Sequence, residues 1–222
     1  MSSVVIQYPE NVRVPEWVND LRSFNRWVDS EEFPEEVRID YLAGEVWIDM
    51  SQEQVWEHNQ VKEEYFITLG MLAKTERQGR FFPDGLRVQH PEADLAAVPD
   101  GVYILNRTFE TLRAVLAGGR AGRPARVEGS PDMVLEVVSD SSVYKDTERL
   151  RELYWKAGIP EYWLVDARRA PLTFDILRRT EKGYVSVRKQ GGWVKSAVFG
   201  KSFRLVQGAD DLGHPTFTLE VR

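Results

Sequence analysis

Two carboxylates stand within apolar stretches of the chain, where charged side chains are unusual. Glu136 has apolar neighbours on both sides, and Asp100 follows Pro99 at the start of a second apolar run. A buried carboxylate is costly unless a cation, hydrogen-bond donors or a proton compensates it. Two such groups on neighbouring strands would offer the oxygen ligands that Mg²⁺ and Mn²⁺ prefer. The alternative interpretation is structural: Glu136 pairs with an arginine, and Asp100 caps the turn after Pro99.

Three further polar residues could extend such a site. Asp132 precedes Glu136 by an even number of residues, so alternation along a strand places both on one face. Asp132 could equally cap a turn at the start of that strand. Glu45 opens a strand and could be another metal-side carboxylate, or only a hairpin residue. His58 belongs to a helical segment, where a lone histidine is more often packed or exposed than functional.

The segments around these residues have the lengths and periodicities of an α/β domain. Continuous apolar runs predict buried strands over residues 98–105, 131–139 and 160–166. Helical spacing of apolar residues predicts helices over residues 16–29, 52–76, 108–117 and 145–157. Because a helix separates the second and third of these strands, we expect a crossover unit in which the two strands are parallel.

Turn residues mark the remaining elements. Alternating runs on both sides of Ala43-Gly44 predict a β-hairpin over residues 38–50. Ser51 and Gln54 form a capping-box pattern at the start of the long helix. The Gly/Arg/Pro-rich segment 118–124 predicts a mobile loop, and short runs after residue 170 predict a C-terminal β-meander.

Length and composition narrow the class of protein. A chain of 222 residues suits one full hydrophobic core, so we expect an extended arm over residues 1–15 and one domain over residues 16–222. The absence of cysteine excludes disulfides, thiolate zinc sites and cysteine nucleophiles. With no signal-peptide pattern and no membrane-length apolar run, we expect a cytoplasmic protein without a membrane partner. A net charge of −6 argues against a general nucleic-acid coat but not against a nuclease.

A set of short motifs runs through this predicted core. They are Gly44-Glu45, His58-Asn59, Pro99-Asp100, Pro131-Asp132, Glu136-Val137-Val138-Ser139, Tyr144-Lys145-Asp146, Leu153-Tyr154 and the stretch Ala157-Gly158-Ile159-Pro160-Glu161-Tyr162-Trp163-Leu164-Val165-Asp166. The last of them is the longest and most specific. Together, over residues 17–206, they resemble the Uma2 (DUF820) family of the PD-(D/E)XK restriction-endonuclease-like superfamily.

The resemblance implies a restriction-endonuclease-like α/β core, with a mixed sheet flanked by helices, and metal-dependent hydrolysis of phosphodiester bonds. Asp100 would match the aspartate of the family's Pro-Asp motif, and Glu136 the acidic residue of its second motif. Both would hold Mg²⁺ or Mn²⁺, which polarises the scissile phosphate and lowers the pKa of the attacking water. His58 would match a residue that the family places near the site.

The lysine that completes the superfamily's site is absent from both positions where the resemblance expects it. These positions hold Val138, two residues after Glu136, and Leu150 on the following helix. Lys145, at the start of that helix, is the nearest substitute and the residue we expect to complete the site. The alternative interpretation of Lys145 is a solvated lysine of the first helical turn.

Three functions are consistent with these observations. The first is a Mg²⁺- or Mn²⁺-dependent endonuclease acting on DNA, which the Asp100 and Glu136 pair favours. The second is a binding or scaffold protein of the same fold without catalysis, which Val138, Leu150 and the acidic net charge favour. The third is a metal-dependent phosphoesterase for small substrates. Because nucleases of this fold often cut as dimers, we also expect a homodimer.

Overall fold

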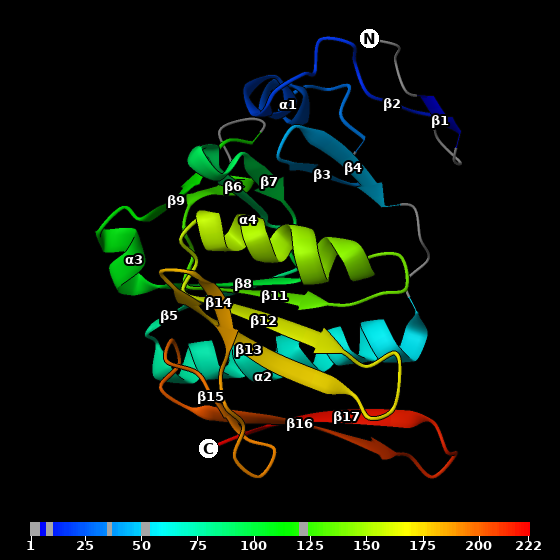
Figure 1. Cartoon of the computed structure of the whole chain (residues 1–222), viewed down its shortest axis with the longest axis vertical. Helices are drawn as coiled ribbons and strands as arrows, with labels where there is room; N and C mark the ends of the chain where they lie inside the picture. The colour runs from blue at the N-terminus through cyan, green and yellow to red at the C-terminus, as the bar shows by residue number, and fades with distance from the viewer. Residues whose placement is uncertain (1–4, 8–10, 35–36, 50–53, 120–123) are drawn as a thin grey trace.

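The protein is built in layers (Figure 1). The computed structural model describes residues 5–7, 11–34, 37–49, 54–119 and 124–222. Two six-stranded sheets form two of the layers, and helix α4 (Leu150–Lys156) lies between them, sharing one buried cluster with strands of both. Helix α1 (Leu21–Val28) packs on the outer face of the first sheet. Helix α2 (Val61–Glu76) and a three-stranded sheet pack on the outer face of the second.

The first sheet has the strand order β4-β3-β7-β6-β10-β9. Its strands are β3 (Arg38–Leu42), β4 (Glu45–Asp49), β6 (Arg87–His90), β7 (Leu95–Ala97), β9 (Ala114–Ala117) and β10 (Arg126–Gly129). The predicted hairpin is confirmed as β3 and β4. Its connecting residues Ala43 and Gly44 have φ values of 51° and 88°, and positive φ at both central positions is what a two-residue hairpin turn requires.

The second sheet has the order β14-β13-β12-β11-β8-β5. Its strands are β5 (Gly79–Pro83), β8 (Gly101–Leu105), β11 (Met133–Val137), β12 (Glu161–Asp166), β13 (Thr173–Thr180) and β14 (Gly183–Ser186). Strands β11 and β12 pair in parallel, so the predicted crossover is confirmed. The connection between them is a π-helical turn, η4 (Lys145–Arg149), followed by α4. Gly158, with φ of 75°, follows the end of α4, as expected for the residue that terminates a helix.

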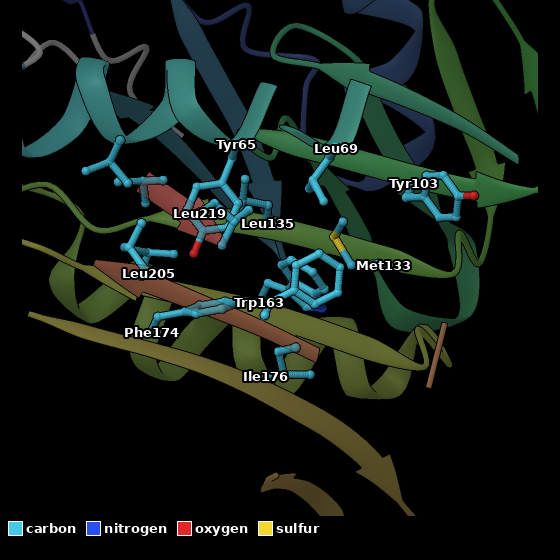
Figure 2. Close-up of a cluster of buried hydrophobic side chains, with 14 of the residues drawn as sticks. Tyr65, Leu69, Tyr103, Met133, Leu135, Trp163, Phe174, Ile176, Leu205 and Leu219 are labelled. Atoms are coloured by element: carbon cyan, nitrogen blue, oxygen red, sulfur yellow. The ribbon is translucent and has the colours of Figure 1, made fainter. Parts of the chain in front are cut away.

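A cluster of buried side chains fixes the second sheet against α2 (Figure 2). Met133, Leu135 and Val137 of β11 face α2, because alternate residues of a strand point to the same side. There they share a buried cluster with Tyr65 and Leu69 of α2. Leu205 and Leu219 complete the cluster from the three-stranded sheet, whose strands are β15 (Val194–Lys195), β16 (Ser202–Ala209) and β17 (Pro215–Val221). A π-helical turn, η1 (Val55–Gln60), leads directly into α2.

Three predictions about local structure need adjustment. The helix predicted over residues 108–117 is wrong beyond its first part: α3 (Asn106–Glu110) ends early, and residues 114–117 form β9. Leu112 has a positive φ of 56°, which breaks the helix, and β9 gains a strand partner in β10. The predicted meander is divided, because β13 and β14 join the second sheet while β15 to β17 form their own. Trp17 lies before α1 rather than on it.

Some predictions fall wholly or partly on residues that the structure does not describe. Ser51 of the predicted capping box lies outside the described residues, as do residues 120–123 of the predicted loop. In the N-terminal segment, β1 (Val5–Gln7) and β2 (Asn11–Arg13) pair antiparallel, and Val12 is buried in the α1 cluster. Among the helices of the described residues, none is long and apolar enough to cross a membrane.

Candidate active site

A polar cavity of about 200 Å³ lies where the two large sheets approach each other. Its walls come from β3 and β4 of the first sheet, the π-helical turn η1, the residue before β8, strand β11, the turn after β11, and the π-helical turn η4. The lining residues are Arg38, Asp49, His58, Asp100, Glu136, Val137, Ser139, Ser142, Lys145 and Asp146. We call this cavity the acidic pocket, because four of its residues are carboxylates.

Glu136 is placed in the acidic pocket by the alternation of β11. Leu135 and Val137 face α2, so Glu136 faces α4 on the opposite side of the sheet. There the hydroxyl of Tyr154 donates a hydrogen bond of 2.7 Å to Oε1 of Glu136. Burial raises the pKa of the Glu136 carboxyl well above its ordinary value, and the nearby carboxylates of Asp100 and Asp146 raise it further.

Asp100 is buried beside cations rather than beside other anions alone. Its Oδ1 lies 3.1 Å from the Arg38 guanidinium and 3.5 Å from Nζ of Lys62, and its Oδ2 accepts the Val137 N–H at 2.7 Å. Nε2 of His58 is 3.8 Å from Oδ2. Burial raises the pKa of Asp100, but the positive charges of Arg38 and Lys62 lower it more, so the carboxyl stays ionised. The backbone bond to Val137 also ties the start of β8 to the end of β11.

Lys145 enters the acidic pocket through the π-helical turn η4. The N–H of Leu150 donates to the carbonyl of Lys145, five residues earlier, which is the hydrogen-bond spacing of a π-helix. The Nζ atom of Lys145 lies 3.4 Å from Oδ2 of Asp40 and 4.0 Å from Oδ1 of Asp146. Burial lowers the pKa of Lys145, but the carboxylates of Asp40, Asp146 and Glu136 raise it above its ordinary value. The ammonium is therefore charged.

Asp146 is a second carboxylate whose ionisation is disfavoured. It is 2% exposed, and burial raises its pKa to about 7 even though Lys145 and a hydrogen bond from the Ser142 hydroxyl lower it. Its Oδ1 atom has no hydrogen-bond partner among the described residues. The acidic pocket therefore holds one carboxyl with a lowered pKa, Asp100, and two with raised values, Glu136 and Asp146.

Comparison with known proteins places this architecture. The family model named Uma2, described as "Putative restriction endonuclease", matches residues 21–205. The chain belongs to the Uma2 family. A solved structure with a similar fold is a "putative nuclease belonging to DUF820" from Anabaena variabilis, which is 19% identical, with a TM-score of 0.60 over 82% of this chain and 90% of that one. No match was found among curated proteins.

The Uma2 fold brings together four of the six residues that the sequence singled out. Asp100, Glu136, Lys145 and His58 all line the acidic pocket, although the chain between His58 and Lys145 passes through both sheets. Lys145 is 6% exposed, so the alternative of a solvated lysine is wrong. Glu136 accepts its hydrogen bond from Tyr154, and the Arg38 guanidinium nearby lowers the pKa of Glu136, so an arginine partly compensates this carboxylate.

Glu45 and Asp132 lie elsewhere. The Glu45 side chain is 61% exposed and accepts hydrogen bonds from Arg149 and from the indole N–H of Trp47. The carboxylate of Asp132 is bound by the Arg113 guanidinium and by the N–H of Leu105 at 2.8 Å. Asp132 sits just before β11, whereas Glu136 sits near its other end, so the two do not share a cavity.

Sequence reasoning missed several residues of the acidic pocket and of its supports. Asp40 and Asp49 come from the hairpin, and Arg38 and Lys62 bind Asp100. Asp40 carried the same signal as Glu136, because it is an acidic residue in the middle of a short apolar strand. Arg38 and Lys62 had no comparable signal, since charged residues in such positions are usually solvated.

The residues of the acidic pocket fit a Mg²⁺ or Mn²⁺ ion. A bound cation would relieve the repulsion that raises the pKa of Glu136 and Asp146. Among the described residues, no group of three or more acidic or histidine side chains is already arranged to hold an ion. Mg²⁺, however, is commonly held by one or two carboxylates and keeps several water ligands. Asp100 and Glu136 are the residues that would hold it.

Proposed function

We propose that this protein is a Mg²⁺- or Mn²⁺-dependent endonuclease that hydrolyses phosphodiester bonds in DNA. The observation that carries the proposal is the convergence of Asp100, Glu136 and Lys145 on one buried polar cavity. Two carboxylates and a cation are the residue types that phosphodiester hydrolysis with a divalent metal requires. Membership of the Uma2 family supports the same reaction class.

The two carboxylates Asp100 and Glu136 and the residues that contact them have distinct roles in this proposal. A divalent metal held by Asp100 and Glu136 supplies a Lewis acid for the phosphate and lowers the pKa of the attacking water. Tyr154 fixes the Glu136 carboxylate in its rotamer through the 2.7 Å hydrogen bond. Arg38 and Lys62 keep Asp100 ionised. These contacts hold both carboxylates in place before the substrate arrives.

Lys145 acts as a cation rather than as a base. Its carboxylate neighbours raise its pKa, so its ammonium keeps its proton at neutral pH. A charged donor beside the scissile phosphate stabilises the negative charge that develops on the phosphate oxygens in the transition state. It can also orient the attacking water by donating to it or by holding the carboxylate that does so. Lys145, which lies on η4, takes the place of the superfamily lysine, whose two expected positions hold Val138 and Leu150.

Calorimetric titration with Mn²⁺ tests the metal site. Wild type should bind one Mn²⁺ ion, and Glu136→Gln should weaken the binding at least about tenfold because half of the carboxylate pair is removed. The matched control is Glu45→Gln, which removes an acidic residue outside the acidic pocket and should leave binding unchanged. Wild-type protein that binds no Mn²⁺, or Glu136→Gln protein that binds it normally, would contradict the proposal.

Cleavage of plasmid DNA and single-stranded DNA tests the role of Lys145. Lys145→Met should reduce the cleavage rate about a hundredfold or more, because one transition-state charge contact is lost, while Mn²⁺ binding persists. Lys156→Met is the control, since Lys156 lies on the same helical segment but is paired with Glu152 at the surface, with 45% of its side chain exposed. Equal cleavage by wild type and Lys145→Met would remove Lys145 from the site.

A binding or scaffold protein of the same fold is the second candidate. It is favoured by the apolar residues at both expected lysine positions: Val138 and Leu150 are 0% and 1% exposed and belong to the hydrophobic interior. In that case Mn²⁺ binding and DNA cleavage would both be absent, while DNA binding in a gel-shift assay would remain.

Two active sites let a nuclease cut both strands of a duplex in one encounter, and a homodimer is part of the proposal for that reason. Sedimentation velocity at micromolar concentration, with and without a DNA duplex, should give the mass of two chains. A single-chain mass in both conditions would limit the proposed reaction to one strand per encounter.

A further inference from the structure

A second cavity, distinct from the acidic pocket, opens at the opposite end of the same strands. Its volume is about 610 Å³, and its wall includes Asp132, which precedes β11. Glu136, in the acidic pocket, lies four residues further along the strand, which is about 13 Å at the usual rise of a β-strand. The two cavities share no lining residue. We call the second one the arginine cavity.

The arginine cavity has an excess of positive charge on a protein whose net charge is −6. Its charged lining residues are Arg107, Arg113, Arg178, Arg179, Asp132 and Glu161. Four guanidinium groups therefore face two carboxylates. Because acidic residues outnumber basic ones in the whole chain, chance placement would give the opposite balance.

The two carboxylates, Glu161 and Asp132, form no ion pair with three of the four arginines. Glu161 is 1% exposed and accepts hydrogen bonds from Trp163 Nε1 at 3.0 Å, from the Ser196 hydroxyl at 2.7 Å, and from the backbone N–H groups of Ala197 and Val198. None of these donors is an arginine. Its role is to hold the loop after β15 against β12.

Asp132 is likewise engaged within the fold. One of its oxygens accepts from the Arg113 guanidinium and the other from the N–H of Leu105. Asp132 therefore compensates Arg113 alone among the arginines of the cavity.

Three arginines keep uncompensated charge in the cavity. Arg179 donates from Nε to the carbonyl oxygen of Trp155 at 2.8 Å, which orients the guanidinium without neutralising it. The side chains of Arg107 and Arg178 are exposed, and they make no hydrogen bond or ion pair with any residue that the structure describes. They come from two separate elements, α3 and β13.

We propose that the arginine cavity binds a phosphorylated small molecule of nucleotide size. The planar guanidinium fork of arginine matches phosphate oxygens in pairs. A phosphate monoester carries a charge of about −1.5 to −2 near pH 7, which balances the excess of two positive charges in the cavity. A volume of 610 Å³ lies within the usual range for small-ligand sites, and Pro160 and Val198 in its wall offer apolar contact to the organic part of the ligand.

Titration of the whole protein with thymidine monophosphate, in buffer containing EDTA, tests this site. EDTA removes the divalent metal that would hold a phosphate in the acidic pocket, so nucleotide binding in this buffer does not depend on the proposed nuclease activity. Wild type should bind the nucleotide, and the double variant Arg107→Ala/Arg178→Ala should bind it at least about tenfold more weakly. Both substituted side chains are exposed, so the fold should persist, and urea unfolding should confirm it.

The matched control removes two other exposed arginines. Arg169 and Arg188 are exposed and line neither cavity, so Arg169→Ala/Arg188→Ala should bind the nucleotide as wild type does. Equal weakening in this control would mean that overall charge, not the cavity, attracts the ligand, and would overturn the proposal. Wild type that fails to bind at millimolar nucleotide would overturn it as well.

Three further probes distinguish the sources of the phosphate. Inorganic phosphate should compete with the nucleotide, while thymidine without a phosphate should not bind. If inorganic phosphate binds as tightly as the nucleotide, the cavity recognises the free anion and the organic part of the proposal is wrong. If a short DNA duplex binds through Arg107 and Arg178 while the mononucleotide does not, the surface contacts a nucleic-acid backbone and the small-molecule site is excluded.

Discussion

At the scale of single residues, more carboxylates than cationic side chains line the acidic pocket. Asp100 is compensated by Arg38 and Lys62, so its pKa is lowered. Glu136 and Asp146 have raised pKa values because burial and neighbouring carboxylates oppose a second and third negative charge. These buried carboxylates lower the stability of the metal-free folded protein, as is common when a site is arranged in advance for a ligand.

Removal of the Glu136 charge should therefore stabilise the metal-free protein. In the unfolded chain at pH 8 the carboxyl ionises freely, whereas the folded chain must either bury the charge or keep the proton. Glu136→Gln keeps an oxygen that can accept from the Tyr154 hydroxyl, so the free energy of unfolding in urea should rise by about 1 kcal/mol or more. Glu45→Gln, at the surface, should change it by less than about 0.5 kcal/mol. A less stable Glu136→Gln protein would contradict this account.

Asp146 should make stability depend on pH in a defined window. Its pKa is about 7 in the folded chain and 3.8 as an ordinary aspartate. Between these values the folded state holds a proton that the unfolded state has released, so the free energy of unfolding falls as pH rises from about 4 to about 7. Below about pH 4 the Asp146 carboxyl does not lower the free energy of unfolding, and above about pH 7 its full destabilising effect is present. Metal-free Asp146→Asn should show a smaller fall across the window in urea titrations, and an unchanged slope would show that another group is responsible.

At the scale of elements, two π-helical turns border the acidic pocket. The turn η1 carries His58, and η4 carries Lys145 and Asp146. A π-helical turn is a rare, strained local form that often occurs at functional sites, because the extra residue turns the side chains before it toward a new direction. In this chain the extra residue of η4 is what points Lys145 into the cavity while Leu150 stays in the hydrophobic interior.

Deletion of Thr147 tests the role of η4. With one residue fewer, the turn should return to α-helical geometry and rotate Lys145 and Asp146 by about 100° relative to α4. Far-ultraviolet circular dichroism should stay helical, while the proposed DNA cleavage is lost and the pH dependence assigned to Asp146 disappears. Thr147→Ala is the control, because it removes only the 2.7 Å hydrogen bond to Val143 and keeps the register. A deletion variant as active as wild type would show that the π-helical turn has no part in the site.

At the scale of the whole molecule, the acidic pocket joins the two large sheets. Arg38 reaches from β3 to Asp100 beside β8, and Asp40 reaches from β3 to Lys145 on η4. Arg149 also donates to the carbonyl of Leu42. The site exists only when both sheets are packed on α4, so its integrity reports on the packing of the two layers.

Arg38→Met should weaken the link between the sheets. It leaves the Asp100 carboxylate with Lys62 as its main cation, and the pKa of Asp100 should rise. Loss of one partner from a buried ion pair costs several kcal/mol, reduced here because the Arg38 side chain is 21% exposed. We expect a loss of about 2 kcal/mol in the free energy of unfolding at pH 8, against less than about 0.5 kcal/mol for Arg188→Met at the surface. Equal effects of the two substitutions would show that the Arg38–Asp100 pair does not stabilise the fold.

The sequence by itself determined the elements whose signals are local. Apolar runs and turn residues predicted the β3–β4 hairpin, β11, β12 and the crossover between them, because the alternation of side chains and the preferences of glycine act over a few residues. The same signals marked Asp100 and Glu136 as unusual, since a carboxylate in a buried apolar run must be compensated by a cation, by hydrogen-bond donors or by a proton.

Tertiary structure decided what depends on partners distant in the chain. Residues 114–117 are predicted as the end of a helix but form β9, because pairing with β10 outweighs a weak local preference. Arg38 lines the acidic pocket, and Asp40 and Lys62 contact its residues, because packing of two sheets and α2 brings them to Lys145 and Asp100. No spacing along the sequence encodes these distances, since they arise only when separate elements bury their apolar faces together.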